Sequence, residues 1–355
     1  MKADVLEILD SFNINGKVVD YFPIGNGHIN STFLCGTDTG HKYILQRINN
    51  SVFKDVDLLM SNYFKVSEYF KSIGFEAIEI IKTKNDKYYY NDPENPHRLY
   101  KFIENTIWFE EVKDLTTVFK AGEAFGKLHK ALKGFDANEL GEVIPNFHNT
   151  KQRYLNLLDA IKEDKLGRVK TCLPEIEVVK SFEKEFDKVV SAIEKNEIPL
   201  VVTHNDPKIN NVLFDRDTKE FRTVIDLDTV MPGSYLYDFG DALRSLFTGD
   251  NEDSEDLSKL VVNYDIFDAY AKGYVGEMKN VLVPKEKELL AFSSFLLSIE
   301  CGMRFLEDYI RGDVYFKTRK PNHNLLRART QLTLAKDIFK NLDKLNEIVK
   351  NIYNS

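Results

Sequence analysis

The 355-residue chain has only three cysteines, one tryptophan and no excess of basic charge. Cys35, Cys172 and Cys301 lie far apart and form no Cys-x-x-Cys pair, which argues against a disulfide framework and a paired-cysteine zinc site. Acidic residues outnumber basic residues by 56 to 48, so we expect no nucleic acid partner, because such binding rests on Lys and Arg neutralising phosphates. No apolar run reaches the ~18 residues that a membrane span needs. We therefore expect a cytoplasmic protein that binds no membrane.

Short runs rich in β-branched and aromatic residues fill the first hundred residues and alternate with Gly, Asn and Asp, a pattern typical of an antiparallel sheet. The runs begin at Val18, Thr32, Lys42, Glu76, Lys87 and Arg98. A helix is expected over 56–70, where apolar residues recur at three- and four-residue steps. After about residue 107 long amphipathic segments predominate. Strand signals return only over 199–226, in short runs that we expect at the surface of a helical lobe.

These patterns divide the chain into two lobes. A chain of this length exceeds what one hydrophobic core usually supports. We predict an α+β fold, with a small antiparallel-sheet lobe over residues 1–106 and a large, mainly helical lobe over residues 107–355. A cleft between two such lobes is where a small molecule would bind. We expect the protein to be a monomer.

The most informative segment runs from Thr203 to Val230 and carries carboxylates and carboxamides beside β-like runs. Asp206 and Asn211 are five residues apart, which is the spacing of the catalytic Asp and the magnesium-binding Asn in protein kinases. Asp226 follows Asp206 by 20 residues, behind a strand-like run, where a kinase places its main magnesium carboxylate. The set predicts phosphoryl transfer from ATP with Mg²⁺ as cofactor. The alternative is a pair of turns in which Asp and Asn bond their own backbone.

Two further strings resemble kinase or phosphate-loop motifs but have the wrong spacing. Asp238-Phe-Gly begins 32 residues after Asp206, too far for the magnesium carboxylate. We expect Asp238 to be a helix N-cap or a buried anchor for the catalytic loop, and Asp241 to be a carboxylate in the first helical turn. The glycines at 122 and 126 lack the spacing of a phosphate loop and predict helix packing instead.

A glycine-rich turn contains Gly25 and Gly27 between two β-like runs, where a bare backbone can approach phosphates closely. The strand-like run that follows should carry a lysine for the α- and β-phosphates, yet Gln46 and Arg47 stand there. Either Arg47 substitutes, or Lys42 reaches in from the start of the run, or the metal carries most of the charge. The nucleotide-binding candidates are Gly25, Gly27 and Arg47.

The spacing of Asp206, Asn211 and Asp226 in a two-lobed chain resembles the aminoglycoside phosphotransferase-like branch of the protein-kinase-like superfamily. A narrower resemblance extends over the whole chain. The strings GNGHINSTF, YILQRIN, YKFIENT, KLGR, THNDPKINNVLFD, VIDLDTVMPGS, DFGDALR and ECGMRFLEDYIRGDVYF, in this order, are similar to the N-acetylhexosamine 1-kinase family. The resemblance implies a two-lobed protein-kinase-like fold and ATP-dependent phosphorylation of the anomeric hydroxyl of N-acetylglucosamine and N-acetylgalactosamine.

The resemblance also implies roles for single residues. Asp206 would be the general base, Asn211 and Asp226 the Mg²⁺ ligands, and Lys208 a contact to the transferring phosphate or the sugar. Lys208 also suits this place on physical grounds, because it puts a cation where negative charge gathers in the transition state. The residues that would hold the N-acetyl sugar are His28, Asp206, Arg304 and Tyr315. Pro207 departs from the pattern, since a small polar residue is more usual there.

Two other functions remain open at this point. One is a kinase of the same fold that acts on another small alcohol, such as an aminoglycoside, choline or a different sugar. The acidic run from Asp250 to Asp256 could be offered as a site for a polycationic antibiotic, but so dense a run is typical of a solvated loop. The other is a catalytically silent nucleotide-binding module, which the missing lysine suggests and the complete set of carboxylates and carboxamides opposes.

Overall fold

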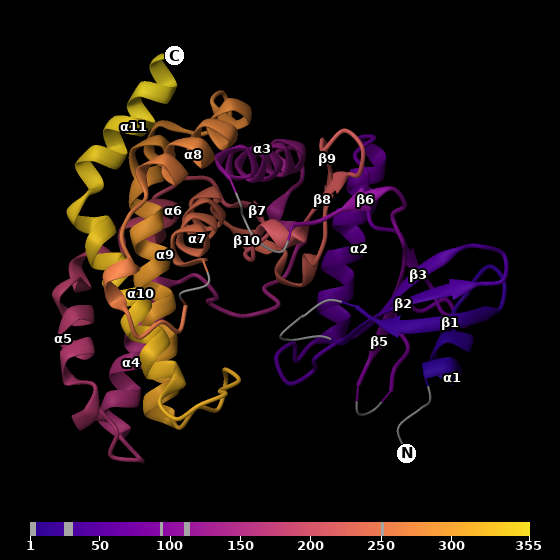
Figure 1. Cartoon of the computed structure of the whole chain (residues 1–355), viewed down its shortest axis with the longest axis horizontal. Coiled ribbons are helices and arrows are strands. Elements are labelled where there is room, and N and C mark those ends of the chain that lie inside the picture. The colour runs from indigo at the N-terminus through magenta and orange to yellow at the C-terminus, as the bar shows by residue number, and fades with distance from the viewer. Residues whose placement is uncertain (1–4, 25–30, 93–94, 110–113, 250–251) are drawn as a thin grey trace. The chain divides into compact units, whose positions relative to one another are not determined.

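The computed structural model describes residues 5–24, 31–92, 95–109, 114–249 and 252–355, and the chain folds into two compact units (Figure 1). The first unit comprises Met1–Ile107, Asn138–Ile144 and Leu213–Met231. The second comprises Trp108–Ala137, Pro145–Val212 and Pro232–Ser355. A single division between residues 106 and 107 therefore leaves out the two segments by which the chain returns to the first unit. The nucleotide and substrate roles of the two lobes stay predictions.

A five-stranded antiparallel sheet with the order β1-β2-β3-β5-β4 forms most of the first unit (Figure 1). Its strands are β1 (Val18–Pro23), β2 (Ser31–Thr37), β3 (Lys42–Arg47), β4 (Ile80–Ile81) and β5 (His97–Lys101). The sheet is predicted correctly except for two runs. The run at 76–81 is a strand only at its last two residues, and the strand expected at 87–90 is wrong.

The run at 87–90 packs its rings instead of pairing its backbone. Tyr88 lies against Phe64, with ring centroids 4.6 Å apart, and the Tyr89 hydroxyl donates to Asp57 at 2.9 Å. Tyr90 makes an isolated bridge to His97. β-branched and aromatic residues fit any half-buried surface, so their enrichment does not by itself identify a strand.

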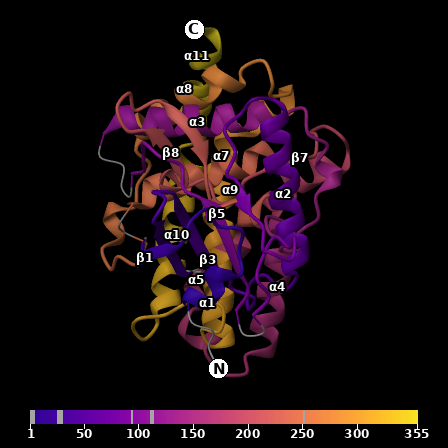
Figure 2. The same cartoon turned by 90° about the vertical axis from the view of Figure 1, so that its right-hand side faces the viewer.

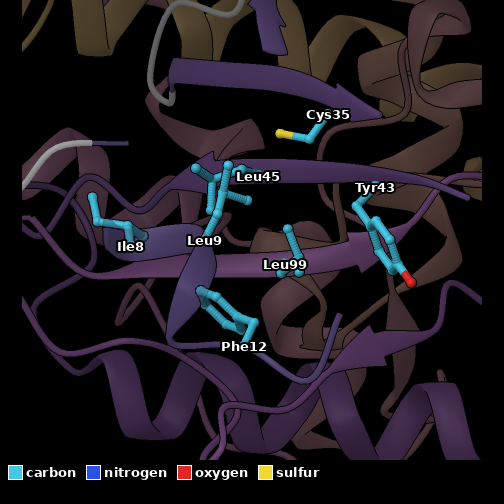
Figure 3. Close-up of a cluster of buried hydrophobic side chains, with 7 residues drawn as sticks. All are labelled: Ile8, Leu9, Phe12, Cys35, Tyr43, Leu45 and Leu99. Atoms are coloured by element: carbon cyan, nitrogen blue, oxygen red, sulfur yellow. The ribbon is translucent and has the colours of Figure 1, made fainter. Parts of the chain in front are cut away.

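Two helices cover opposite faces of the sheet. Leu99 of β5 joins the cluster of Ile8, Leu9, Phe12, Cys35, Tyr43 and Leu45 under α1 (Val5–Asp10), which Figure 3 shows. Tyr100, the next residue of β5, stacks on Tyr63 of α2 (Val56–Ser72) with ring centroids 5.2 Å apart. Successive strand residues point to opposite faces, so α1 and α2 lie on different sides. The predicted helix over 56–70 is confirmed.

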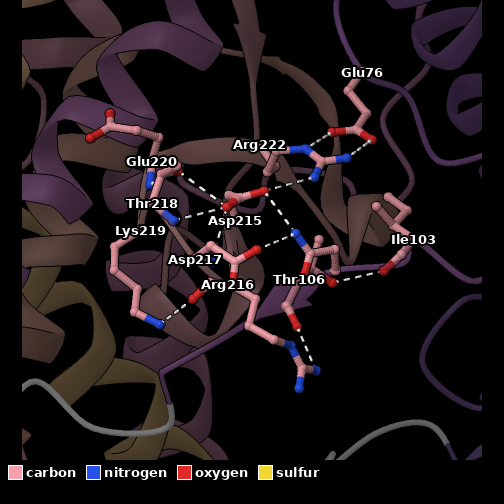
Figure 4. Close-up of polar contacts among 11 residues, drawn as sticks. Glu76, Ile103, Thr106, Asp215, Arg216, Asp217, Thr218, Lys219, Glu220 and Arg222 are labelled. Carbon is pink, nitrogen blue, oxygen red and sulfur yellow. Dashed lines mark hydrogen bonds and ion pairs between the residues drawn. The ribbon is translucent and has the colours of Figure 1, made fainter.

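The segment Leu213–Met231 adds strands to the first unit. β6 (Thr106–Ile107), β8 (Val212–Asp215) and β9 (Phe221–Val224) form a sheet with the order β6-β8-β9. Arg222 of β9 donates to both carboxylate oxygens of Glu76 at 2.6 Å, as Figure 4 shows. The expectation that these strands lie at the surface of the helical lobe is wrong, since Val212 and Phe214 are fully buried.

The second unit is helical, and its longest helix, α9 (Pro284–Arg311), lies against α4, α7 and α10 (Figures 1 and 2). The other helices are α3 (Leu115–Leu132), α4 (Thr150–Glu163), α5 (Leu173–Ser181), α6 (Lys188–Glu194), α7 (Tyr235–Thr248), α8 (Tyr264–Met278), α10 (His323–Lys340) and α11 (Leu342–Asn354). Among the described helices only α9 is long and apolar enough to cross a membrane, and 89% of its most apolar window is buried inside the protein. It is a core helix of the unit.

Close helix contacts in this unit depend on glycine. A methyl group at Gly122 of α3 would collide with the Tyr270 carbonyl of α8, and one at Gly273 of α8 would collide with the Phe119 carbonyl of α3. The same holds for Gly240 of α7 against the Ser293 carbonyl of α9. The expectation that the glycines near 122 serve helix packing is confirmed.

The buried carboxyl of Glu286 makes stability depend on pH. Its Oε2 accepts from the Val283 amide at 2.9 Å at the start of α9, and burial raises the pKa of Glu286 from 4.5 to about 7. Between these values the folded protein holds a proton that the unfolded chain releases, so this group's contribution to the free energy of unfolding falls as pH rises.

We therefore expect Glu286→Gln, which keeps the acceptor and cannot ionise, to leave stability near pH 5 unchanged and to raise it at pH 8 by about 1–3 kcal/mol. Urea unfolding at both pH values measures this difference. Glu288→Gln, at an exposed position two residues further along α9, is the matched control and should show the same small effect at both pH values. A Glu286→Gln effect that does not change with pH would contradict the assignment.

Candidate active site

The loop that carries Asp206 follows β7 (Val201–Thr203), which pairs with β10 (Met231–Gly233). Asn205 has a left-handed backbone with φ of 62°, a conformation that Asn tolerates better than most residues. The Lys208 amide donates to the Asp206 carbonyl at 2.9 Å, which closes a three-residue turn around Pro207. The proline ring fixes φ near the value that such a turn needs. Pro207 is therefore compatible with this loop and stiffens it.

The structure brings Asp206, Lys208 and Asn211 together. Lys208 Nζ lies 2.7 Å from one carboxylate oxygen of Asp206, and Asn211 Nδ2 donates to the other at 3.3 Å. Asn211 Nδ2 also donates to the Asp206 carbonyl at 2.9 Å. The Asp206 carboxylate chiefly, against the opposing effect of burial, raises the pKa of Lys208. The loop thus presents a carboxylate and a firmly charged ammonium group side by side, both partly exposed.

A buried carboxylate of α7 holds this loop from behind. Asp238 is fully buried, and its two oxygens accept the amides of His204 and Asn205 at 2.7 Å each. His129 Nε2 lies 2.7 Å from the same carboxylate, and its Nδ1 lies 2.8 Å from the Tyr274 hydroxyl. Burial opposes the charged form, yet these contacts, led by His129, hold the pKa of Asp238 below its usual value. The expected buried anchor is confirmed.

Two details of α7 correct the sequence interpretation. Ser234 is the N-cap and accepts from the Leu236 amide at 3.3 Å, so Asp238 is not the cap. Asp241 lies beyond the first turn and pairs with Arg244 at 2.6 Å. A Ser directly before a Tyr-rich start was the available signal for the cap, since Ser is a preferred N-cap residue.

Asp226 belongs to the first unit. It follows β9 with a left-handed backbone, φ 61°, and starts a 3-10 helix over Leu227–Thr229. Asp206 and Asn211 belong to the second unit. That all three serve one ion stays a prediction.

The donor chemistry suits magnesium. Among the described residues no group of three His, Cys, Asp or Glu side chains could hold a metal ion without other ligands. Mg²⁺ bound with ATP needs only one or two protein oxygens besides the phosphates and water. The amide oxygen of Asn211 and the carboxylate of Asp226 are hard oxygen donors of that kind.

The nucleotide-binding candidates are only partly described. Gly25 and Gly27, together with His28 of the sugar set, lie outside the described residues. Arg47 ends β3 opposite His97. Lys42 begins β3, and its Nζ lies 3.4 Å from Glu104 Oε2 on the surface.

Arg98 of β5 is a charged residue that the sequence interpretation missed. It is fully buried in the first unit and forms an ion pair with Asp228. Burial lowers the pKa of Arg98, but the Asp228 carboxylate, Tyr100, Tyr63 and Asp226 together outweigh burial and raise the pKa overall. The sequence shows only a charged residue inside an apolar run. It does not indicate the ion pair, because Asp228 lies far from Arg98 along the chain.

Arg304 and Tyr315 meet around one ring. The Arg304 guanidinium lies over Phe316, 5.6 Å from the ring centroid, and over Phe147 at 4.9 Å. Tyr315 packs edge-on against Phe316 with centroids 4.8 Å apart, while half of Tyr315 remains exposed. The structure thus brings together these two sugar candidates and adds two phenylalanines.

Asp308 of α9, another residue missed from sequence, anchors the segment that carries Tyr315. Its carboxylate accepts the backbone amides of Val314, Tyr315 and Phe316 at 2.8–3.0 Å. The same carboxylate accepts Asn324 Nδ2 at 2.8 Å. An exposed tyrosine on a firmly held backbone is a suitable binding surface, because little freedom is lost when a ligand contacts it.

Comparisons with known proteins point to one family. The model described as "Phosphotransferase enzyme family" matches residues 20–271. The microcompartment-associated aminopropanol kinase is 14% identical with a TM-score of 0.63, covering 96% of this chain and 97% of that one. An aminoglycoside phosphotransferase from Alicyclobacillus acidocaldarius is 11% identical with a TM-score of 0.64, covering 99% and 98%. Choline kinase LicA from Streptococcus pneumoniae is 13% identical with a TM-score of 0.52, covering 91% and 95%. The predicted kinase-like α+β fold is confirmed.

Removing the Asp238 carboxylate should disrupt the loop. We expect Asp238→Ala to lower the free energy of unfolding by about 3 kcal/mol or more, because His129 and two backbone amides lose a buried acceptor. Asp268→Ala, which removes a surface pair with Lys272, is the control and should cost about 1 kcal/mol or less. Urea unfolding followed by circular dichroism measures both. Equal losses would show that Asp238 is not an anchor.

Proposed function

Because the chain belongs to the phosphotransferase enzyme family, we propose that it is an ATP-dependent kinase that phosphorylates the anomeric hydroxyl of N-acetylhexosamines. The product is the sugar 1-phosphate. The observation that carries the proposal is the Asp206 carboxylate, held by Lys208 and Asn211 on a loop that Asp238 anchors. The N-acetylhexosamine substrate rests on the resemblance over the whole chain, together with the surface at Arg304 and Tyr315.

Asp206 orients the acceptor hydroxyl and takes its proton. Phosphoryl transfer needs little covalent chemistry from the protein, so positioning and charge stabilisation account for most of the catalysis. Lys208 supplies a cation beside the base, where charge builds up on the transferred group. Asn211 and Asp226 would hold Mg²⁺, which supplies charge neutralisation on the phosphates when bound. Gly25, Gly27 and Arg47 are proposed to contact the nucleotide.

The charges around Phe147 favour a neutral substrate over a cationic one. Arg153 donates to the Phe147 carbonyl at 3.0 and 3.1 Å, and Arg304 lies over the ring of the same residue. Burial, and then the nearby Arg304, lower the pKa of Arg153. Two guanidinium groups at one ring repel an ammonium ligand but can donate hydrogen bonds to hydroxyl or acetamido oxygens. His28, Arg304 and Tyr315 are proposed to bind the sugar in this way.

A kinase of another small alcohol is the second candidate, and the activities of structurally similar proteins favour it. They include aminopropanol, ethanolamine and choline kinases. The acidic run offers such cationic substrates little, because three of its four described carboxylates already have basic partners. These pairs are Glu252 with Arg327, Asp253 with His323 and Lys320, and Asp256 with Lys259.

An acceptor panel separates the two candidates. Purified protein is incubated with ATP and Mg²⁺ and with N-acetylglucosamine, N-acetylgalactosamine, choline, ethanolamine or kanamycin, and the products are read by ³¹P NMR. We expect an anomeric phosphate on the two N-acetylhexosamines and no transfer to the amines. Transfer to an amine-bearing alcohol alone would establish the second candidate. ATP binding without transfer to any acceptor would indicate a silent module.

The general base is tested by Asp206→Asn. This change keeps the shape of the side chain but removes proton acceptance, so we expect kcat to fall by at least ~10² with little change in ATP affinity. Steady-state kinetics and nucleotide titration measure the two quantities. Asp217→Asn, on an exposed turn of the first unit, is the control and should retain kcat. Near-normal turnover of Asp206→Asn would place the base elsewhere.

A further inference from the structure

Position 46 of β3 carries no charge, but the residue opposite it on β5 is a cation, Arg98. In the pairing of β3 with β5, Gln46 is the register partner of Arg98. Gln46 Oε1 accepts from Arg98 Nε at 3.0 Å and from Nη2 at 2.6 Å. A neutral residue thus stands where β3 would carry a lysine, and its side chain orients a cation on the neighbouring strand.

The surroundings of Arg98 are closed. Its guanidinium lies between the rings of Tyr63 and Tyr100, 5.5 and 5.2 Å from their centroids. The ion pair with Asp228 is almost completely buried on both sides. Arg98 therefore cannot itself contact a phosphate without rearrangement. A buried ion pair often stabilises a protein no more than an apolar pair of similar volume does. We therefore expect this pair to have a role other than stability.

Asp228 lies on the turn that carries Asp226. The left-handed residue 226 and the 3-10 helix Leu227–Thr229 separate β9 from β10. At the far end of the turn, Asn62 of α2 donates to the Val230 carbonyl at 3.0 Å. The turn is thus held by β5 through Asp228 and by α2 through Val230. A backbone in the left-handed region persists only where its surroundings hold it.

We propose that the missing strand lysine is replaced by Arg98, which acts as a positioning residue: through its ion pair with Asp228 it holds the Asp226 carboxylate in place for the metal–nucleotide complex. The inference rests on the proposed function for the role of Asp226, but not on the sugar substrate. The cation thus lies on β5 and not on β3. It orients a metal ligand and does not contact the phosphates.

Metal binding is the direct readout. Mn²⁺ is titrated into the protein with saturating ADP and free Mn²⁺ is followed by electron paramagnetic resonance, alongside ADP binding without metal. We expect Arg98→Met to weaken Mn²⁺ binding at least tenfold while metal-free ADP binding changes less than twofold. Arg98→Lys keeps the charge but lacks the planar guanidinium, and it should weaken Mn²⁺ binding less. This variant keeps the test valid if Arg98→Met fails to fold.

The matched control is Arg222→Met, which breaks the half-buried pair with Glu76 in the same unit. It should lower thermal stability without changing Mn²⁺ affinity. If it weakens Mn²⁺ binding as much as Arg98→Met does, the effect is general loosening of the unit and the proposal is overturned. Unchanged Mn²⁺ affinity in folded Arg98→Met also overturns it.

A charge rescue distinguishes positioning from packing. In Arg98→Met/Gln46→Lys the cation returns to β3, and we expect part of the lost Mn²⁺ affinity to return. Recovery supports a role for the charge, and no recovery in a folded double variant contradicts it. The Mn²⁺ titration uses no sugar, so it is independent of the acceptor panel. If the panel shows no transfer to a sugar but Arg98→Met selectively weakens Mn²⁺ binding, the proposed substrate is wrong and this inference still holds.

Discussion

The acceptance of two backbone amides by the Asp238 carboxylate is the interaction on which the candidate catalytic loop depends. It fixes His204 and Asn205, and with them the left-handed residue that turns the chain toward Asp206. His129 Nε2 contacts the same carboxylate at 2.7 Å. A carboxylate can accept several amides at once, and such bonds are stronger than those between neutral groups. The loop is therefore held by the helical core and not by its own exposed side chains.

A related arrangement is found in the first unit. There Asp228 is the buried carboxylate, Arg98 its cationic partner, and the left-handed residue is Asp226 itself. In each unit a buried acid supports a strained backbone position next to a side chain proposed for chemistry. Asp308 extends the pattern to the segment at Tyr315, where one carboxylate accepts three successive amides. Asp238 and Asp308 thus hold backbone amides, whereas Asp228 holds the Arg98 guanidinium, and all three are buried acids next to the functional candidates.

Local patterns predicted much of this fold. The helix over 56–70, the strands up to residue 47 and the packing glycine at 122 follow from periodicity, propensity and spacing within a few residues. The grouping of Asp206, Lys208 and Asn211 was also accessible, because they lie on one short loop. The return of 213–231 to the first unit was not accessible, because it depends on contacts such as Arg222 with Glu76, 146 residues apart.

Arg98 and Asp308 show the same limit at the candidate site. Each has a local sequence typical of its element, and its role comes from partners brought near only by folding. The run at 87–90 shows the opposite error, since strong β propensity there reflects ring packing on α2. Propensity reports how well a side chain fits a half-buried surface, whereas function depends on which distant groups share that surface.

We propose that Asn211 and Asp226, which belong to different units, bind one metal–nucleotide complex together with Asp206. A double-mutant cycle on Mn²⁺ affinity in the presence of ADP tests this most directly, using Asn211→Ala, Asp226→Ala and the double variant. The account predicts one Mn²⁺ per chain and a double variant that loses clearly less affinity than the two single losses combined. Additive losses, or a Mn²⁺ affinity that either single variant leaves unchanged, would contradict it.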